Sequence, residues 1–443
     1  MRRLSITILF LCIIFHISVK ACTIVAVSGR VTADGRPLLL KNRDSKGWDI
    51  RIRIINGQKY TYLCQCSVGN ATALSGFNDA GFSIVSSHSY NMTNHDYNWN
   101  AYIMQLALGK CASVEDFEHL LDTLSKPVSV CANYGVLDAQ GNVAIFETNA
   151  FTHVRYDADS SDSGFLIRTN FSFSESTDEV NAISPSSFSR YQIASDYVVH
   201  ALKTEGAVSK DILLGLTRCL VDSGGVNLID MAPFGESDIT PVDFTKYVPR
   251  YISTSAMVIQ GVLPGESPRL TVAWTMVGPP LTTVAIPYLI TSHKVLPQKA
   301  KPGTEGHTWL VSKGQQMKNK CFIDSRTVDL AKLYNRCHTG VMQKVVMVED
   351  EILCYGNRLL EGLRNEIMSD KDIEDYYTWI DNYLDDQYKQ VFDEVGETNA
   401  IKEIGVGESP HTIYYYDIIG RQTKNPNADG VVIRKGERAI ILR

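Results

Sequence analysis

The sequence has no run of lysine or arginine residues, no low-complexity stretch and no internal repeat of fixed period. Its 443 residues include 43 basic and 49 acidic side chains, which gives a formal net charge of −6. A mildly acidic chain without a basic cluster offers no electrostatic footprint for nucleic acid. Hydrophobic residues make up 44% of the chain and charged residues 21%, which argues against bulk disorder and a polytopic membrane protein.

Several signatures of common enzymes are also absent. Gly-x-Ser-x-Gly, His-Glu-x-x-His and a phosphate-binding glycine loop do not occur. No cysteine lies in a Cys-Gly-x-Cys-Trp-type segment, which disfavours a papain-like peptidase. Cys64 and Cys66 are alternate residues of one predicted strand, so their side chains face the same way. That arrangement favours a disulfide or a core pair over a metal site.

Residues 1–21 have the pattern of a secretory signal peptide. Arg2 and Arg3 form a short positive region, residues 8–15 are an unbroken apolar run, and Val19-Lys20-Ala21 precedes a cleavage site. The apolar run is too short to span a bilayer comfortably, and a retained membrane anchor is the alternative interpretation. We expect signal peptidase to cut after Ala21 and the mature protein to be exported to a bacterial periplasm, cell surface or medium.

Cleavage after Ala21 makes Cys22 the first residue of the mature chain. An N-terminal cysteine carries a thiol and an α-amine whose pKa is near neutrality, so one residue supplies both a nucleophile and a base. Two alternatives remain open: Cys22 carries a lipid anchor, or it is a buried or disulfide-bonded structural cysteine. Lys20 is a poor residue just before a lipid-modified cysteine, which favours catalysis over lipidation.

Blocks of short strands separated by helices predict an α+β fold in which stacked sheets are flanked by helices. Turn signals, helix starts and periodicity set the expected boundaries of these elements. The expected elements are β-rich blocks at 23–90, 132–170 and 253–289, hairpin turns at Asp34-Gly35 and at 78–81, and helices starting at Ser113 and covering 187–202 and 208–220.

Cys22-Thr23-Ile24-Val25, an Asp34-Gly35 turn and Asn42-x-Asp44 resemble the N-terminal signature of N-terminal-nucleophile (Ntn) hydrolases. The branch in question contains choloylglycine hydrolases, penicillin V acylase and isopenicillin N acyltransferase. Further elements of the resemblance follow in order: Asn78-x-x-Gly81, Thr169-Asn170 and Ser187-x-Ser189-Arg190-Tyr191. The resemblance implies a four-layer αββα sandwich for residues 22–297.

The resemblance also implies roles for individual residues. Cys22 would supply the nucleophilic sulfur and the basic amine, and Asp44 would position that amine. Asn170 would donate to the tetrahedral oxyanion, and Arg190 would stabilise the thiolate. His88 falls near the position of a second asparagine of the family and is a candidate substrate-binding residue.

Each of these assignments has a simpler alternative. Asp44 could be a turn residue paired with Lys41 or Arg43. Asn170 precedes Phe-Ser and therefore also reads as a glycan acceptor. Arg190 could be a surface residue of a helix. Bile salt hydrolases place an arginine where this chain has Lys41, so we do not predict bile salt specificity.

The sequence thus predicts a hydrolase of non-peptide C–N bonds in linear amides, acting through an acyl-Cys22 thioester. Its partner would be a small-molecule N-acyl amide, which it would hydrolyse or use as an acyl donor. Because Cys22 supplies both nucleophile and base, we expect no metal and no cofactor. The alternative from another class is a non-catalytic surface lipoprotein anchored through Cys22. Disulfide pairing among the remaining cysteines and a homo-oligomeric state stay open.

After residue 297 the composition changes. Residues 298–400 predict a charged helical extension, and residues 410–443 predict a β-rich tail. The tail pattern Tyr416-Asp417-x-x-Gly420-Arg421 followed by Gly430-Val431-Val432-Ile433 resembles the sorting tail of Bacteroidetes proteins handled by type IX secretion. A small accessory β-hairpin module is the alternative.

Overall fold

The computed structural model describes residues 21–69, 72–92, 99–174, 184–304 and 306–393, and four short strands after residue 413. Apart from Ala21, the predicted signal peptide lies outside the described residues. The chain divides into two compact units at Asp386/Gln387, and each is considered by itself. No helix of the described residues is long and apolar enough to cross a membrane.

The first sheet has six antiparallel strands in the order β10-β1-β2-β12-β13-β14. β1 and β2 form the predicted N-terminal hairpin, and Gly35 in its connection has a φ of 75°, which favours glycine. The strands are β1 Cys22–Val27, β2 Leu38–Asp44, β10 Phe165–Arg168, β12 Ser253–Gln260, β13 Val272–Met276 and β14 Ala285–Tyr288.

The second sheet has seven antiparallel strands, β3 to β9, in sequence order. The predicted turn between β5 and β6 is closed by Asn78, whose Oδ1 accepts hydrogen bonds from the backbone nitrogens of Ala80 (3.1 Å) and Phe82 (3.0 Å). The strands are β3 Ile50–Asn56, β4 Thr61–Ser67, β5 Ser75–Asn78, β6 Ser83–His88, β7 Ala132–Leu137, β8 Val143–Thr148 and β9 His153–Asp157.

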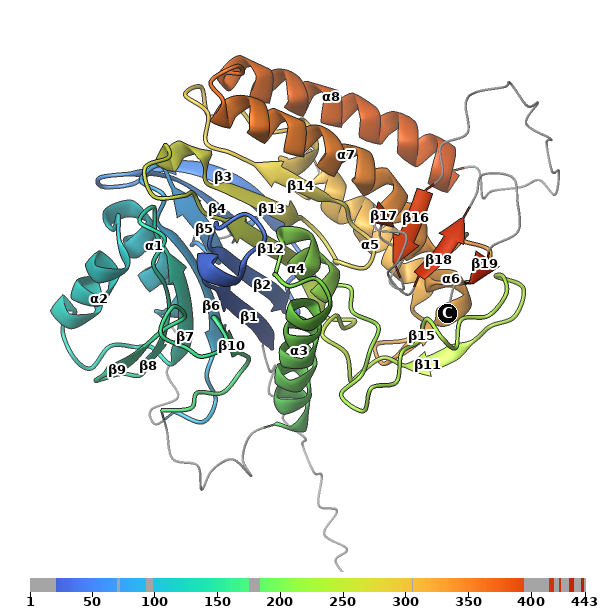
Figure 1. The fold of residues 1–443 in the computed structure, drawn as a ribbon, viewed down its shortest axis with the longest axis horizontal. Coiled ribbons are helices and arrows are strands. Elements are labelled where there is room, and N and C mark those ends of the chain that lie inside the picture. Colours follow the sequence, from blue (N-terminus) through green and yellow to red (C-terminus); the bar gives the residue numbers. More distant parts are fainter. Residues whose placement is uncertain are drawn as a thin grey trace, which may run out of the picture. The chain divides into compact units, whose positions relative to one another are not determined.

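The two sheets pack face to face, and β1 contacts β6, β7 and β8 across the interface. Every residue of β1, β2 and β7 is buried, because helices cover the outer faces of both sheets. α1 (Asn100–Lys110) and α2 (Val114–Thr123) cover the seven-stranded sheet around a core that includes Phe117 and Phe146. α3 (Pro185–Thr204), α4 (Lys210–Leu216) and α7 (Val341–Arg364) cover the six-stranded sheet. Figure 1 shows the resulting αββα arrangement, which confirms the predicted fold class.

α4 is shorter than the helix predicted over 208–220. It ends at Leu216, and the next backbone nitrogens bond three residues back: Thr217 to Leu214 and Arg218 to Gly215. This tight turn directs Arg218 to α7, where its guanidinium donates two 2.7 Å hydrogen bonds to the Glu349 carboxylate. The prediction of a longer helix was wrong because this buried ion pair redirects the chain.

The region after residue 297 is mainly helical, as predicted. α5 (Trp309–Cys321), the short β15 (Thr327–Asp329) and α6 (Leu330–Leu333) precede α7, and α8 (Asp370–Tyr388) follows it. In Figure 1, α7 lies over β14 and α8 lies beside α7. Tyr376 of α8 donates a 2.6 Å hydrogen bond to the backbone oxygen of Ile352. Residues 298–386 therefore pack onto the same body as the two sheets.

The second unit contains a four-stranded antiparallel sheet in the order β17-β16-β18-β19. The strands are β16 Tyr414–Asp417, β17 Gln422–Thr423, β18 Gly430–Ile433 and β19 Ile440–Ile441. The described part of the tail consists of these strands, and the resemblance of residues 410–443 to a sorting tail stays a prediction.

No disulfide joins the cysteines of the described residues. Cys64 and Cys66 are fully buried on β4 and belong to the core beneath α1, so of the two predicted alternatives, a disulfide or a core pair, the structure has the core pair.

Candidate active site

The N-terminal hairpin places Cys22 and Asp44 at the same end of the six-stranded sheet. β1 begins at Cys22, β2 ends at Asp44, and the antiparallel register pairs Cys22 with Arg43. Facing residues of antiparallel strands have their side chains on the same face, so the Cys22 and Arg43 side chains are neighbours. All three residues are buried. The number of residues between Cys22 and the Asn42-x-Asp44 motif is thus the length of a hairpin that brings Asp44 back beside Cys22.

Asn170, which follows β10, holds the backbone nitrogen of Cys22. That nitrogen donates a 2.9 Å hydrogen bond to Asn170 Oδ1, and Asn170 Nδ2 donates at 3.0 Å to the backbone oxygen of His88. Asn170 therefore lies at the predicted position, but its oxygen faces Cys22. Its side chain is 2% exposed and bonded at both ends, which is incompatible with the alternative of a glycan.

Arg190 of α3 is also part of this site. It is 1% exposed, which contradicts the alternative of a surface helix residue. Its Nη1 donates to the backbone oxygen of Cys22 at 2.7 Å, and its Nη2 donates to Asn170 Oδ1 at 2.9 Å. Burial and nearby Arg250 lower the pKa of Arg190 to about 10, and the charges of Asp44 and Cys22 act in the opposite direction. The guanidinium thus ties the Cys22 main chain to Asn170 while remaining charged at neutral pH.

Asp44 is held by a residue that the sequence analysis missed. Arg250 donates to Asp44 Oδ2 from Nε at 2.9 Å and from Nη2 at 2.5 Å. Ser253 Oγ donates to Asp44 Oδ1 at 2.5 Å, and Asn42 Nδ2 donates to the same oxygen at 3.2 Å. The ion-pair partner of Asp44 is therefore Arg250, and the suggestion of Lys41 or Arg43 was wrong.

No local signal in the sequence identifies Arg250. It lies 206 residues after Asp44, in the irregular segment before β12. The pairing of β12 with β2, which places Ser253 opposite Asp44, is what brings it to the site. Arg250 Nη1 also donates to Ser186 Oγ at 2.9 Å and so connects Asp44 to the start of α3.

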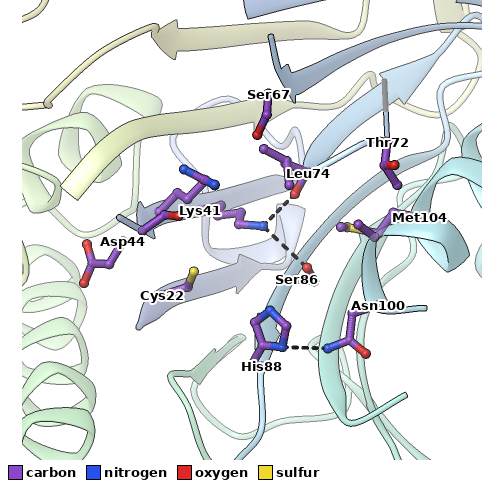
Figure 2. Close-up of a pocket in the computed structure, with 13 residues that line it drawn as sticks. Cys22, Lys41, Asp44, Ser67, Thr72, Leu74, Ser86, His88, Asn100 and Met104 are labelled. Carbon is purple, nitrogen blue, oxygen red and sulfur yellow. Dashed lines mark hydrogen bonds between the residues drawn. The ribbon is translucent and has the colours of Figure 1, made fainter. Parts of the chain in front are cut away.

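A cavity of about 310 Å³ opens onto the Cys22 side chain. Figure 2 shows Cys22, Lys41, Ser86 and His88 around this space, with the Asp44 carboxylate pointing away from Lys41 and Ser86. His88 therefore lines the cavity, as a substrate-binding residue would, and its ring nitrogen lies 2.8 Å from Asn100 Nδ2. The lining residues are Cys22, Lys41, Arg43, Asp44, Ser45, Ser67, Thr72, Leu74, Ser86, His88, Asn100, Ala101 and Met104.

Two cations of β2 belong to this lining. Lys41 Nζ donates to the backbone oxygen of Leu74 at 2.6 Å and lies 3.4 Å from Ser86 Oγ. Arg43 is 7% exposed, and burial lowers the pKa of its guanidinium, while the charges of Cys22 and Asp44 act in the opposite direction. Within the described residues, no group of three His, Cys, Asp or Glu side chains is placed to bind a metal ion.

Residues 31–212 match the sequence model of the acyl-coenzyme A:6-aminopenicillanic acid acyl-transferase family. The matched range contains Asp44, His88, Asn170 and Arg190 and begins nine residues after Cys22. This match confirms the predicted resemblance to Ntn hydrolases of the acyltransferase and amidase branch. None of the curated proteins compared matches the sequence.

Solved structures give distant likenesses. The Caenorhabditis elegans ortholog of N-acylethanolamine-hydrolyzing acid amidase has a TM-score of 0.35 and 12% identity, over 55% of this chain and 93% of that chain. A mutant conjugated bile acid hydrolase from Clostridium perfringens has a TM-score of 0.37 and 13% identity, over 62% and 93%. Penicillin V acylase from Agrobacterium tumefaciens has a TM-score of 0.35 and 15% identity, over 62% and 87%.

Proposed function

We propose, from the family match of residues 31–212, that this protein is an Ntn cysteine amidase or acyltransferase acting on linear amide C–N bonds. The observation that carries the proposal is the placement of Cys22. Its side chain lines a cavity, while its backbone nitrogen and oxygen are held by Asn170 and Arg190. A purely structural cysteine needs neither the cavity nor two buried polar groups fixing its main chain.

The proposed reaction starts after cleavage between Ala21 and Cys22, which converts the Cys22 nitrogen into a free amine. The amine takes the thiol proton, and the sulfur attacks the carbonyl carbon of the amide. The amine then gives the proton to the leaving nitrogen, the C–N bond breaks, and an acyl-Cys22 thioester remains. Water releases the acyl group as an acid, or an acceptor amine takes it. Cys22 supplies both reacting groups, so the proposal includes no cofactor.

The hydrogen bond from the Cys22 nitrogen to Asn170 Oδ1 supports a modified role for Asn170. We assign Oδ1 to orienting the free amine, with Arg190 holding that oxygen in place. Asn170 Nδ2 carries two hydrogens, one of which bonds the His88 oxygen, and the other is the proposed donor to the oxyanion. Because the Asp44 carboxylate is ion-paired with Arg250, we assign Asp44 an indirect role, positioning the amine through the pairing of β2 with β1, and not that of its hydrogen-bond acceptor.

Export by a signal peptide and removal of residues 1–21 by signal peptidase are part of the proposal. The rival is a lipid-anchored surface protein in which Cys22 is acylated. N-acylation of Cys22 would convert the amine into an amide and so remove the base, and it would place a lipid among buried groups. This geometry favours the catalytic role. A lipid-sized increase in the mass of the N-terminal peptide would favour the rival.

The test is N-terminal sequencing of the secreted protein, followed by incubation with an acylating activity-based probe and intact-mass analysis. We expect a chain that starts at Cys22 and carries one acyl group. Cys22→Ala should lose labelling and amidase activity, whereas the matched control Cys354→Ala, at an exposed cysteine, should keep both. A mature chain that retains Ala21, or a Cys22→Ala variant of equal activity, would contradict the proposal.

A further inference from the structure

Arg43 is a buried cation whose observed hydrogen-bond partners are all neutral. Its Nη1 donates to Thr254 Oγ1 at 2.5 Å and to the backbone oxygen of Gly47 at 3.2 Å. Among the described residues it forms no ion pair, since the neighbouring carboxylate of Asp44 is taken by Arg250. Burying a charge without a counter-charge lowers the stability of the fold. An uncompensated buried arginine therefore points to a function that needs its charge.

The position of Arg43 suggests that reason. It lines the cavity that reaches Cys22, and it faces Cys22 directly in the β1–β2 register. Lys41, two residues earlier on the same face of β2, adds a second positive charge to the lining. Among the described lining residues Asp44 is the single acid, and it is already neutralised.

The rest of the lining is mixed, with apolar contributions from Leu74, Ala101 and Met104 beside the polar ones. Ser67, Thr72, Ser86, His88 and Asn100 all contribute polar groups to the cavity. Its volume of about 310 Å³ is at the small end for ligand pockets, which favours a short group in this part of the site. A short group with hydrogen-bonding and charged atoms can use these partners.

We infer that Arg43 makes this cavity a subsite for an anionic group of the substrate, so that the preferred amide carries a carboxylate a few bonds from its scissile carbonyl. The inference rests on the proposed function for the identity of the reacting bond. The carboxylate can belong to the acyl side or to the amine side of the amide. In both cases it would form the same ion pair with the Arg43 guanidinium.

The first test uses alkylation of the thiol and needs no turnover. Iodoacetate and iodoacetamide both replace iodide with the Cys22 sulfur, but only iodoacetate carries a negative charge. The two rate constants are measured by peptide mass spectrometry at Cys22 and, in the same sample, at the exposed Cys354. We expect the iodoacetate-to-iodoacetamide rate ratio to be about tenfold or more higher at Cys22 than at Cys354.

Variants then assign this preference to Arg43. Arg43→Gln should bring the Cys22 ratio close to that of Cys354, and Arg43→Lys should keep part of the preference. Lys46→Gln removes one positive charge from an exposed position three residues away and should leave the ratio unchanged. The inference is overturned if the wild-type ratio at Cys22 does not exceed that at Cys354, if neither reagent reaches Cys22, or if Arg43→Gln keeps the preference.

The second test locates the carboxylate. Glutaryl 4-nitroanilide is compared with its methyl ester for the acyl side, and butanoyl 3-carboxy-4-nitroanilide with butanoyl 4-nitroanilide for the amine side. We expect one pair to show a kcat/KM ratio of about tenfold or more in favour of the anion, and Arg43→Gln to lose it. Arg43→Gln lowering all four values equally would assign Arg43 to the chemistry and overturn the inference. Equal cleavage of all four through acyl-Cys22 would overturn the inference and leave the proposed function standing, whereas failure of all four to acylate Cys22 would contradict the proposed function.

Discussion

Two buried arginines of the same body, Arg218 and Arg43, have opposite surroundings. Arg218 lies between α4 and α7, where both of its Nη atoms bond Glu349 and two backbone oxygens accept its remaining hydrogen bonds. Arg43 lies beside Cys22, donates to neutral partners among the described residues and faces a cavity. Arg218 therefore contributes to the stability of the fold, whereas Arg43 contributes little to it and is available to a ligand.

The largest expected effect comes from breaking the Arg218–Glu349 pair. Glu349→Gln leaves the Arg218 charge buried without a counter-charge and should lower the free energy of unfolding by about 3–5 kcal/mol. Urea denaturation followed by circular dichroism measures this. The double variant Arg218→Met/Glu349→Leu removes both charges and should recover most of the loss. A single variant as stable as wild type would contradict the structural role.

Arg250→Met should have the next largest effect on stability, because it leaves a buried carboxylate, that of Asp44, without its cation. Asp44 would lose its cation but keep the hydrogen bonds from Ser253 and Asn42, so we expect a loss of about 2–4 kcal/mol of unfolding free energy. Amidase activity should fall with it. Arg250→Met/Asp44→Asn should regain stability and remain inactive; regained activity would show that Asp44 has no part in the reaction.

Lys318 is a further buried cation, and we expect its effect on stability to be smaller and to depend on pH. It is a buried cation whose nitrogen donates to the Tyr251 backbone oxygen at 3.1 Å, and burial lowers its pKa to about 8 from 10.5. Between these values the unfolded chain binds a proton that the folded chain lacks, so the free energy of unfolding should rise with pH across this window. Lys318→Met should remove that slope and raise the stability at pH 7 by about 1–2 kcal/mol. Urea titrations near pH 8 and near pH 10.5 measure the slope of the free energy of unfolding against pH. The same slope in Lys318→Met as in wild type would contradict this assignment.

Arg43→Met should have the smallest effect on stability and the opposite sign from Glu349→Gln. Because Arg43 forms no ion pair with a carboxylate of the described residues, replacing it with an apolar side chain should leave the free energy of unfolding unchanged or raise it by about 1 kcal/mol. A melting-temperature comparison with Glu349→Gln tests the contrast directly. A loss as large as that of Glu349→Gln would place Arg43 among the structural cations.

Much of the site follows from local sequence. The Asp34-Gly35 turn and the Asn42-x-Asp44 motif predict a hairpin, and a hairpin necessarily brings its two ends together. Strand alternation places the side chains of Arg43 and Asp44, as neighbours on β2, on opposite sides, and the suggestion of a pair between them overlooked this. These features need only the backbone geometry of adjacent strands.

The rest depends on tertiary structure. Arg250 reaches Asp44 only because β12 pairs with β2, and no periodic pattern marks that pairing in advance. The early end of α4 depends on Glu349, more than a hundred residues further along the chain. The orientation of the Asn170 amide is set by Arg190 and by the backbone of His88, which come from different elements. Long-range partners of this kind cannot be obtained from residue spacing.

The central claim is that Cys22 carries the acyl group. The most direct measurement is rapid quenching of the mature protein during turnover of butanoyl 4-nitroanilide, followed by peptide mass spectrometry with and without hydroxylamine. We predict a butanoyl adduct on the Cys22 peptide that hydroxylamine removes, as expected for a thioester. An adduct on another residue, or 4-nitroaniline release without an adduct on Cys22 and undiminished in Cys22→Ala, would contradict the account.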